Sequence, residues 1–547
     1  MKNSFTLTGQ IADVVTGIIF SGKIEVSEGK IKSVVPCKNA EEQIIIPGLV
    51  DAHVHIESSM LVPSEFARLA VVHGTVATVS DPHEIANVLG IEGVDFMIGN
   101  GKLTPFKFHF GAPSCVPATG FESSGAILGS SQIDELLSRD EIYYLSEMMN
   151  FPGVLFGDQE VLRKLALAKQ HGKPVDGHAP GLDRDGIEKY AAAGISTDHE
   201  CVTIEEALDK IRSGMKILIR EGSAAKNFDT LLPLLASYPD KVMFCSDDKH
   251  PDDLVAGHIN LLVRRALRSG FDPMNTIRAC TLNPVRHYRL TSGLLQEGDP
   301  ADIVVADNLN DFNILKTYIN GDLVASDGGS LLGSSGCGSP NHFLASYVTD
   351  ADLSVKAGNG MMKVIHATDG SLLTSVERVT PLIKGGLVVP DLQNDILKIV
   401  VINRYKPSKP AIAFVSGFGF RKGALASTVA HDSHNIICVG TIDDDMVSLI
   451  NTLIENKGGI AITDGISSDV LPLPVAGLMS GENGYEVAHK YQDINSKAKA
   501  LGGTLGAPFM TLSFMALLVI PEIKLSDKGL FDGTKFTLTE LFEIQES

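Results

Sequence analysis

Apolar runs that end at polar residues recur through the first half of the chain. Eight of them have the length and composition of strands: residues 45–56, 76–80, 106–110, 143–148, 174–178, 195–199, 216–220 and 241–246. The stretches between them carry apolar residues at helical spacing, most clearly at residues 63–73, 161–171, 185–193 and 204–213. Eight strand–helix units in roughly 240 residues predict an α/β fold built on a TIM-like (β/α)8 barrel, which usually takes about 250. A doubly wound sheet would show the same alternation, but no glycine-rich phosphate loop follows the first strand.

Shorter alternating stretches lie before and after these units. Residues 5–46 alternate apolar and polar positions with turn signals at Ser21-Gly22 and Glu28-Gly29, and residues 293–326 have the same character. We expect the two stretches to pair, which predicts a discontinuous β-sandwich domain from residues 1–46 and 286–335 beside a barrel of residues 47–285. A Gly/Ser-rich passage at 333–340 marks a boundary, and residues 340–547 are predicted to form an additional C-terminal α+β domain.

Composition and net charge limit the partners and the cellular location that we expect for this protein. The 547 residues are 44% hydrophobic and 20% charged, which is typical of a folded globular protein of several domains. A net charge of -20 repels phosphate backbones and anionic lipid, so neither nucleic acid nor a membrane is an expected partner. Seven scattered cysteines without a C-x-x-C pair indicate no disulfide framework, and a cytoplasmic location is expected. The N-terminus lacks a signal-peptide pattern, and the longest apolar run, residues 509–520, is too short to span a bilayer.

The first predicted strand ends in two histidines one residue apart. Because side chains alternate along a strand, His53 and His55 point to the same face and can share a metal. A single histidine at a strand end is more often a hydrogen-bonded structural residue. The interpretation changes because the other strands end in a similar way: the strand-end residues in order are His53, His55, Asp81, His83, Glu147, His178, His199, Asp247 and Asp248. Four histidines with two or more carboxylates at one barrel mouth suffice for two divalent metals.

The strand-end pattern resembles that of the amidohydrolase superfamily and, within it, closely that of the bacterial and archaeal adenine deaminase family. The stretches that carry the resemblance include residues 47–60 (PGLVDAHVHIESSM), 81–90 (DPHEIANVLG), 176–181 (DGHAPG), 197–200 (TDHE), 220–226 (REGSAAK), 245–254 (CSDDKHPDDL) and 423–440 (GALASTVAHDSHNIICVG). The resemblance covers nearly the whole chain. It implies hydrolytic deamination of adenine to hypoxanthine and ammonia in purine salvage, with adenine as partner and a homo-oligomeric state.

The resemblance also implies roles for single residues. The metal set would be His53, His55, Glu147, His178, His199 and Asp247. Glu147 stands where many relatives use a carboxylated lysine, and Asp247 would orient the attacking hydroxide and take its proton. His83, Glu84 and Glu200 are candidates for recognising the base or supplying an acid, with support of the ligands as the alternative, and Asp81 is a further substrate-binding candidate. In the third domain, Asp432 and His434 are weaker candidates for reaching the site.

Attack on C6 of adenine needs a water made nucleophilic by metal. A ligand set of nitrogen and oxygen without thiolate accepts Mn2+, Fe2+ or Zn2+, and the resemblance favours manganese or iron.

Two alternatives to this reaction remain open. Another amidohydrolase reaction, on a cyclic amide such as a dihydropyrimidine, is the nearer alternative, although Glu147 replaces the lysine usual there. The second is a catalytically silent metal-binding protein on the same fold. A zinc deaminase of the cytidine type is disfavoured because no P-C-x-x-C follows His55-Ile56-Glu57.

Overall fold

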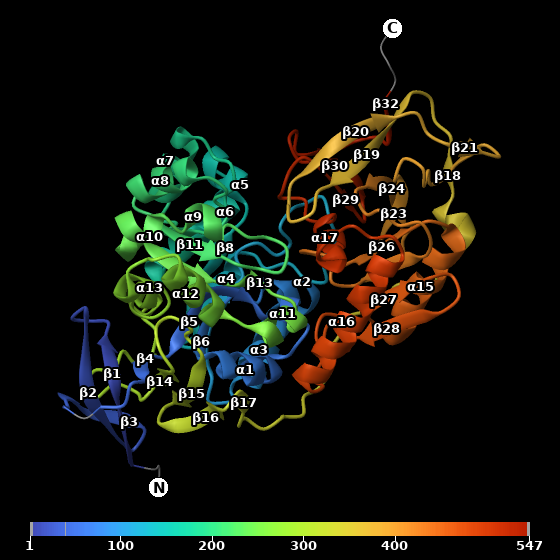
Figure 1. Ribbon diagram of the computed structural model, residues 1–547. Coiled ribbons are helices and arrows are strands. Elements are labelled where there is room, and N and C mark those ends of the chain that lie inside the picture. The colour runs from blue at the N-terminus through green and yellow to red at the C-terminus, as the bar shows by residue number, and fades with distance from the viewer. Residues whose placement is uncertain (1–3, 39, 544–547) are drawn as a thin grey trace.

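Eight parallel strand positions from the central part of the chain surround one core. The computed structural model describes residues 4–38 and 40–543, and Figure 1 shows this core on the left, within a shell of helices. The strands are β5 (Leu49–His55), β6 (Thr75–Ser80), β7 (Lys107–Ala112), β8 (Ile142–Met148), β9 (Val175–Gly177), β10 (Thr197–Asp198), β11 (Lys216–Arg220) and the interrupted pair β12 (Val242–Cys245) and β13 (Asp247–Asp248).

The strands follow one another in chain order, and the last returns to the first. One ladder runs β13-β5-β6-β7-β8-β9 and a second runs β10-β11-β12. The backbone N–H of Ser196 donates to the carbonyl of Val175 at 2.9 Å, which joins the two ladders between β9 and β10. Parallel pairing of Asp247 with Val54 closes the circuit. This is a TIM-like arrangement, in which the carboxyl ends of all strands meet at one face.

Helices fill the connections between these strands, as the spacing of apolar residues predicts. Helix α8 illustrates the local signals: the Thr203 side chain caps its first turn by accepting from the N–H of Glu206, acidic residues lie at its start and Lys210 and Arg212 near its end. The helices are α1 (Pro63–Ala70), α2 (His83–Leu89), α3 (Ile91–Gly101), α4 (Ser130–Leu137), α5 (Phe151–Phe156), α6 (Gln159–Gln170), α7 (Arg184–Ala192), α8 (Ile204–Arg212), α9 (Phe228–Leu231), α10 (Leu234–Ser237), α11 (Pro251–Ala256), α12 (Ile259–Arg268), α13 (Pro273–Ala279) and α14 (Leu282–Tyr288).

The first predicted strand, residues 45–56, is two strands in the structure. β4 (Ile44–Pro47) pairs outside the barrel, and β5 starts after Gly48. A Cβ at Gly48 would lie 2.3 Å from the Val76 side chain, so the change of direction requires a residue without a side chain. The apolar run is continuous because both strands are buried, and hydrophobicity alone therefore gives no sign of the break.

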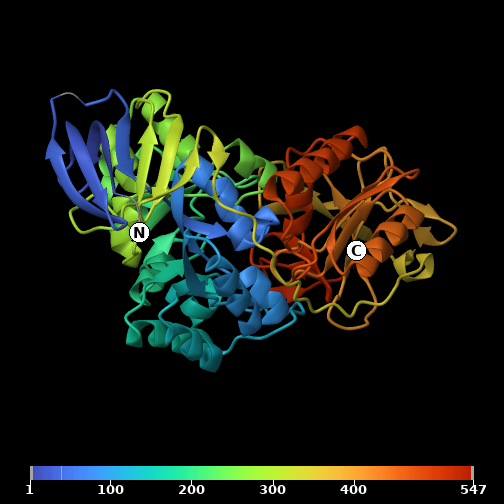
Figure 2. The same ribbon diagram turned by 90° about the horizontal axis from the view of Figure 1, so that it is seen from below.

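A single eight-stranded sheet flanks the barrel and combines both ends of the predicted β region. Figures 1 and 2 show it at the far side of the barrel from the C-terminal region. The prediction of a turn at Ser21-Gly22 is wrong, because both residues lie inside β2; the turn comes at Asp13–Gly17. The strand order is β17 (Gly329–Ser330), β16 (Asp322–Ser326), β15 (Ile314–Ile319), β14 (Ile303–Ala306), β4, β1 (Phe5–Asp13), β2 (Ile18–Ser27) and β3 (Lys30–Pro36).

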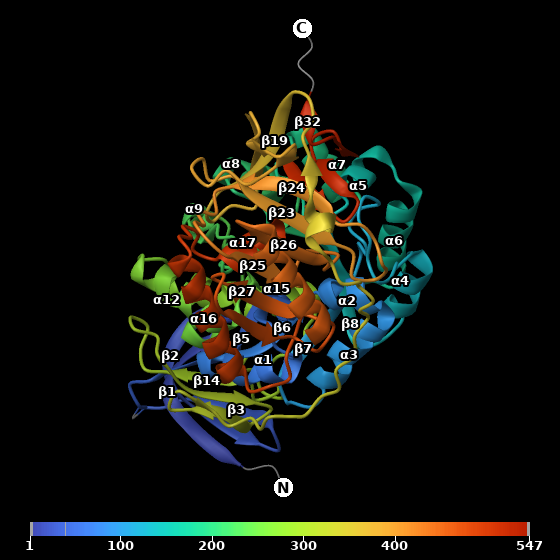
Figure 3. The same cartoon turned by 90° about the vertical axis from the view of Figure 1, so that its right-hand side faces the viewer.

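The C-terminal region, residues 340–543, lies against the carboxyl-end face of the barrel. Figure 3 views this region from the front, with the barrel behind it. Its main sheet contains β20 (Thr374–Val379), β19 (Met361–Ala367), β24 (Ala411–Ser416), β23 (Leu397–Ile402), β26 (Ile436–Gly440), β25 (Ala424–Ser427), β27 (Gly459–Thr463) and β28 (Ser468–Pro472), with β32 (Phe542–Glu543) beside β19. Its helices are α15 (Asp443–Asn456), α16 (Gly484–Ala500) and α17 (Pro508–Phe514). Within residues 4–38 and 40–543, none of the helices has the length and apolar character needed to cross a membrane.

Asp51 on β5 connects the first and last strand positions of the barrel. Its side chain is fully buried and accepts hydrogen bonds from the N–H and the hydroxyl of Ser246, and it lies 2.9 Å from His258 Nε2. Asp51→Ala leaves these buried donors without their acceptor. We expect it to lower the free energy of unfolding by about 1–3 kcal/mol for each buried donor left unsatisfied. The urea midpoint of the purified variant measures this.

Glu188→Ala is the matched control. Glu188 pairs with Arg184 on the solvent face of α7 at 3.3 Å, and both side chains are exposed. Exposed pairs of this kind often contribute nothing measurable, so the midpoint should not move. Equal midpoints for the Asp51 variant and the control would contradict the role assigned to Asp51.

Candidate metal and substrate site

Four histidines from three strand ends converge at the carboxyl-end face of the barrel. His53 and His55 lie on the same face of β5, as their spacing predicts, and their Nε2 atoms are 3.2 Å apart. The ring of His53 stacks on that of His199, which follows β10, with centroids 4.2 Å apart. His178 follows β9, and all four side chains are buried. Two ring nitrogens at this distance either share a hydrogen, with one as donor and the other as acceptor, or bind a common cation.

Glu147, at the end of β8, lies between these histidines. Its Oε1 is 3.3 Å from His55 Nε2, and its Oε2 is 3.2 Å from His199 Nε2 and 2.9 Å from His178 Nδ1. Burial raises the pKa of a carboxyl group, but the surrounding imidazoles, that of His178 foremost, hold the pKa of Glu147 well below its usual range. The ionised carboxylate therefore faces ring nitrogens from both sides, as a bridging ligand would.

Asp247 faces the pair of histidines on β5. Its Oδ1 lies 3.5 Å from His53 Nε2 and 3.4 Å from His55 Nε2. Its backbone has φ of 56°, which is in the left-handed region that non-glycine residues rarely adopt. Such conformations cluster at functional sites, where the surrounding structure holds them in place. Here the conformation aims the carboxylate at the histidines from the break between β12 and β13.

The six residues fit divalent metal. Groups of three or more ligand atoms converge within 4.8 Å, among them His53, His55 and Asp247, and His53, Glu147 and His199. His178 Nε2 and His53 Nδ1 are buried without a hydrogen-bond partner among the described residues. Burial lowers the pKa of His178, yet the carboxylates of Glu200 and Glu147 raise it to about 9, so the surroundings favour positive charge. The donors are nitrogen and oxygen without thiolate, which suits Mn2+, Fe2+ or Zn2+.

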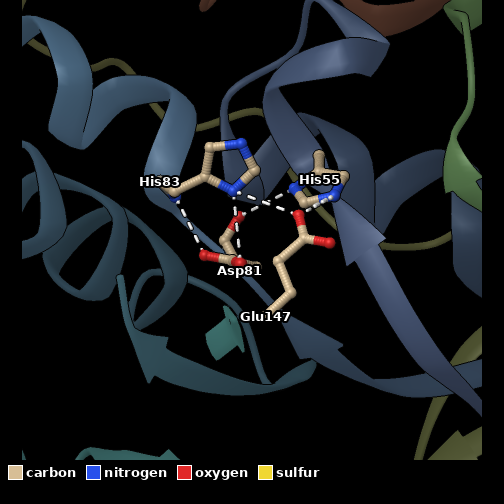
Figure 4. A group of neighbouring side chains, drawn as sticks. All are labelled: His55, Asp81, His83 and Glu147. Carbon is tan, nitrogen blue, oxygen red and sulfur yellow. Dashed lines mark hydrogen bonds and ion pairs between the residues drawn. The ribbon is translucent and has the colours of Figure 1, made fainter. Parts of the chain in front are cut away.

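Asp81 and His83 lie beside this cluster, where β6 leads into α2. Figure 4 shows His55, Asp81, His83 and Glu147 pointing toward one another. His83 Nδ1 lies 3.2 Å from Asp81 Oδ2 and 3.5 Å from Glu147 Oε1. The backbone N–H of His83 donates to Asp81 Oδ1 at 3.1 Å, so Asp81 fixes the start of the helix that carries His83. Both residues border the cluster of histidines and carboxylates, and His83 lines the cavity; their contact with substrate stays a prediction.

Glu200 is engaged by an arginine that the sequence analysis did not single out as a site residue. Arg220, the last residue of β11, donates from Nη1 to Glu200 Oε1 and, at 2.7 Å, to Asp247 Oδ2; its Nη2 donates to Glu200 Oε2 at 3.0 Å. Arg220 therefore orients two of the predicted catalytic carboxylates. Its position could have identified it: Arg220 is the last residue of the seventh predicted strand, and the predicted ligands lie at the ends of other strands.

The C-terminal region brings three side chains to the same site. His431, Asp432 and His434 lie in the loop between β25 and β26 and are all buried. Glu84, in the first turn of α2, accepts from His431 Nδ1 and His434 Nε2, and Asp432 Oδ1 lies 3.6 Å from His83 Nε2. The weak candidates Asp432 and His434 thus reach the site, and His431 is a residue that the sequence analysis missed.

A small cavity lies between the barrel mouth and the C-terminal region. One part of its wall is polar and contains the ligand cluster with His83, Glu84, Arg220 and Asp248. The other part is apolar: Met149, Leu372, Phe514 and Leu517. A pocket with an apolar side and several fixed polar groups suits a small heterocycle.

Family comparisons give the class of this protein. The model of the amidohydrolase family matches residues 44–324, and a model described as the adenine deaminase C-terminal domain matches residues 371–537. The chain belongs to the amidohydrolase family.

Relatives along the whole chain define the group within that family. An adenine deaminase of Salinibacter ruber is 52% identical over 99% of this chain and 100% of its own length, and one of Methanosarcina mazei is 52% identical over 98% and 99%. The chain is thus a member of the adenine deaminases. Among solved structures, a β-aspartyl dipeptidase from Fervidobacterium islandicum is 16% identical, with a TM-score of 0.46, and covers 60% of this chain and 98% of its own.

Arg220→Leu tests the role of the arginine. The change leaves Glu200 and Asp247 buried without their cationic partner. Losing a group that orients ligands typically costs about 10–100-fold in metal affinity or activity, and we expect a fall of that size in kcat/KM. Steady-state kinetics together with metal analysis measure it. Arg268→Leu, which removes an exposed pair with Asp311 at 3.2 Å, is the control and should leave both quantities unchanged. Full activity of the Arg220 variant would show that the two carboxylates need no such partner.

Proposed function

We propose that this protein converts adenine and water to hypoxanthine and ammonia. The observation that carries the proposal is the convergence of six buried histidine and carboxylate side chains with a partly apolar cavity closed by the C-terminal region. Full-length relatives named adenine deaminase support it. The cyclic-amide alternative is less favoured, because these relatives match along both parts of the chain.

We also propose two divalent ions per chain, most suitably Mn2+, with Fe2+ or Zn2+ as alternatives. His53, His55, Glu147, His178, His199 and Asp247 would hold them. Bound metal lowers the pKa of water toward neutrality and so supplies the nucleophile. The buried carboxylates of Glu147 and Asp247 support the assignment, because they place negative charge where cations would bind.

The protein's own side chains would orient the base and move protons. Asp247 has one oxygen beside His53 and His55 and the other on Arg220, a position suited to receiving the proton of the attacking hydroxyl and returning it to the leaving amine. His83, which lines the cavity, would form a hydrogen bond to the edge of the base, and Asp81 would hold His83 in place. Glu200, held by Arg220, keeps that arginine charged and in place.

The remaining sequence predictions belong to the same proposal. We infer a barrel domain of residues 47–285, a β domain of 1–46 with 286–335 and a C-terminal domain of 340–547. The net charge of -20 supports a small-molecule partner rather than nucleic acid or a membrane. A homo-oligomer in the cytoplasm remains the prediction from the sequence.

Metal content tests the two-ion proposal directly. Elemental analysis of active enzyme should give two divalent ions per chain, and chelation should remove them together with activity. His199→Ala should bind fewer ions. His287→Ala is the matched control, because His287 is also largely buried but contacts Ser196 at the start of β10, away from the site. One ion or none in fully active enzyme would contradict the proposal.

Substrate preference tests the reaction. We expect kcat/KM to be highest for adenine when ammonia release is compared for adenine, adenosine, AMP and cytosine, and ring opening is followed for dihydrouracil. A site built to hydrogen-bond a base edge rejects analogues that lack the matching groups by as much as about 10⁴–10⁵-fold. A higher kcat/KM for adenosine or dihydrouracil would overturn the adenine assignment while leaving the metal site intact.

A further inference from the structure

Both carboxylate oxygens of Glu84 are engaged by histidines from the C-terminal region. Oε1 contacts His431 Nδ1 and Oε2 contacts His434 Nε2, and all three side chains are buried. Burial raises the pKa of Glu84, but His431 and the other nearby imidazoles hold it well below its usual range. An ionised carboxylate only accepts hydrogen bonds, so each of the two ring nitrogens facing it carries a hydrogen.

The state of His434 excludes a metal ion between these three residues. The backbone N–H of Ala430 donates to His434 Nδ1 at 3.2 Å, so Nδ1 provides a lone pair and the ring hydrogen is on Nε2. A metal at Nε2 would require a ring that has lost both of its hydrogens. The cluster is therefore a hydrogen-bonded group in which His434 is a fixed donor to Glu84.

His431 is left with one nitrogen free to exchange a proton. Its Nδ1 keeps its hydrogen as long as Glu84 is ionised, so only Nε2 can gain or lose one. His431 lines the cavity, and its Nε2 lies 3.9 Å from Asp248 Oδ1, which lines the same cavity. The ring stacks on Phe514 with centroids 5.1 Å apart, and the backbone N–H of His431 donates to the Ser513 hydroxyl at 3.2 Å. Orientation and tautomer are both set by neighbours, as in a carboxylate–histidine dyad.

We propose that His431 is a catalytic residue whose Nε2 protonates the ring nitrogen next to the reacting carbon of adenine, and that Glu84 is its positioning residue. The inference rests on the proposed deamination and adds a donor for N1 of the purine. It also gives the C-terminal region a chemical function, because the proton comes from a loop outside the barrel.

The protons balance in this scheme. A hydroxyl derived from water adds to C6, and the electron pair of the C6–N1 double bond moves to N1, which takes the hydrogen of His431 Nε2. The proton of the added hydroxyl passes through Asp247 to the amino group, the C6–N bond breaks, and ammonia and hypoxanthine form. The proton released when the next water becomes a hydroxyl restores His431.

His431→Gln is the decisive variant. Glutamine keeps hydrogen-bonding groups near Glu84 but cannot act as an acid near neutral pH. We expect kcat/KM for adenine to fall by about 10²–10⁴-fold, the usual contribution of a positioned proton donor, with metal content unchanged. His489→Gln is the control, because His489 lies on the exposed side of α16, where its Nδ1 is 3.3 Å from Asp493 Oδ2.

The pH profile separates an acid from a packing residue. Burial lowers the pKa of His431, but Glu84 and Asp248 raise it to about 9. The required proton is therefore present below that pH, and kcat/KM should decline above it. The groups that face His431 and would shift this limb are Glu84 on α2, Asp248 on β13, His250 beyond β13, and Asp432 and His434 on its own loop.

Glu84→Gln tests the dyad independently of whether the His431 variant folds. Removing the anion favours neutral His431, so the alkaline limb should move to lower pH. A limb that stays in place in this variant, or a His431→Gln enzyme within tenfold of wild type, would overturn the dyad. Wild-type enzyme that forms no hypoxanthine from adenine would instead overturn the proposed function, and the role of the dyad with it.

Discussion

Buried negative charge at the barrel mouth is the constraint on which the rest of the site depends. Among the carboxylates that lie there, Glu84, Glu147, Glu200 and Asp247 are each at most 4% exposed. An unpaired ionised group in such a place costs several kcal/mol, so each needs a donor with good geometry. Arg220 serves two of them, and imidazoles serve the others. The number of histidines at the strand ends follows from this requirement as much as from metal binding.

The same constraint explains why the C-terminal region must fit the barrel closely. Two donors to Glu84, His431 and His434, come from that region, and contacts outside the site hold the two parts in register. The N–H of Gly484 donates to Glu65 Oε2 at 3.0 Å, and the N–H of Val62 donates to the carbonyl of Ser480 at 3.1 Å. Tyr491 on α16 contacts His250 Nδ1 at 2.5 Å. These contacts join the C-terminal region to the barrel at points outside the cavity.

The spacing of apolar and polar residues predicted the strands and helices of the barrel, because each barrel strand is a short, buried apolar run. The strand at Lys216–Arg220 has the predicted limits. The break at Gly48 was not predictable from hydrophobicity, since it depends on contact with Val76 from another strand. The convergence of the strand-end histidines and carboxylates follows from their places in the strands, and their role as metal ligands stays a prediction. The roles of Arg220 and His431 do not follow from the sequence, because each depends on a carboxylate that lies opposite it only in the folded protein. Glu84 and His431, for example, are 347 positions apart.

That separation has a consequence for how the protein is made. The strands bearing the barrel ligands, and Glu84 with them, are synthesised well before His431 and His434, which follow 347 and 350 positions after Glu84. Domains fold in the order in which they leave the ribosome, so the barrel can gather its histidines while Glu84 still lacks its donors. A chain that ends early would carry an incomplete site. Synthesis of the C-terminal region is therefore the step that supplies His431 and His434 and completes the site at the barrel mouth.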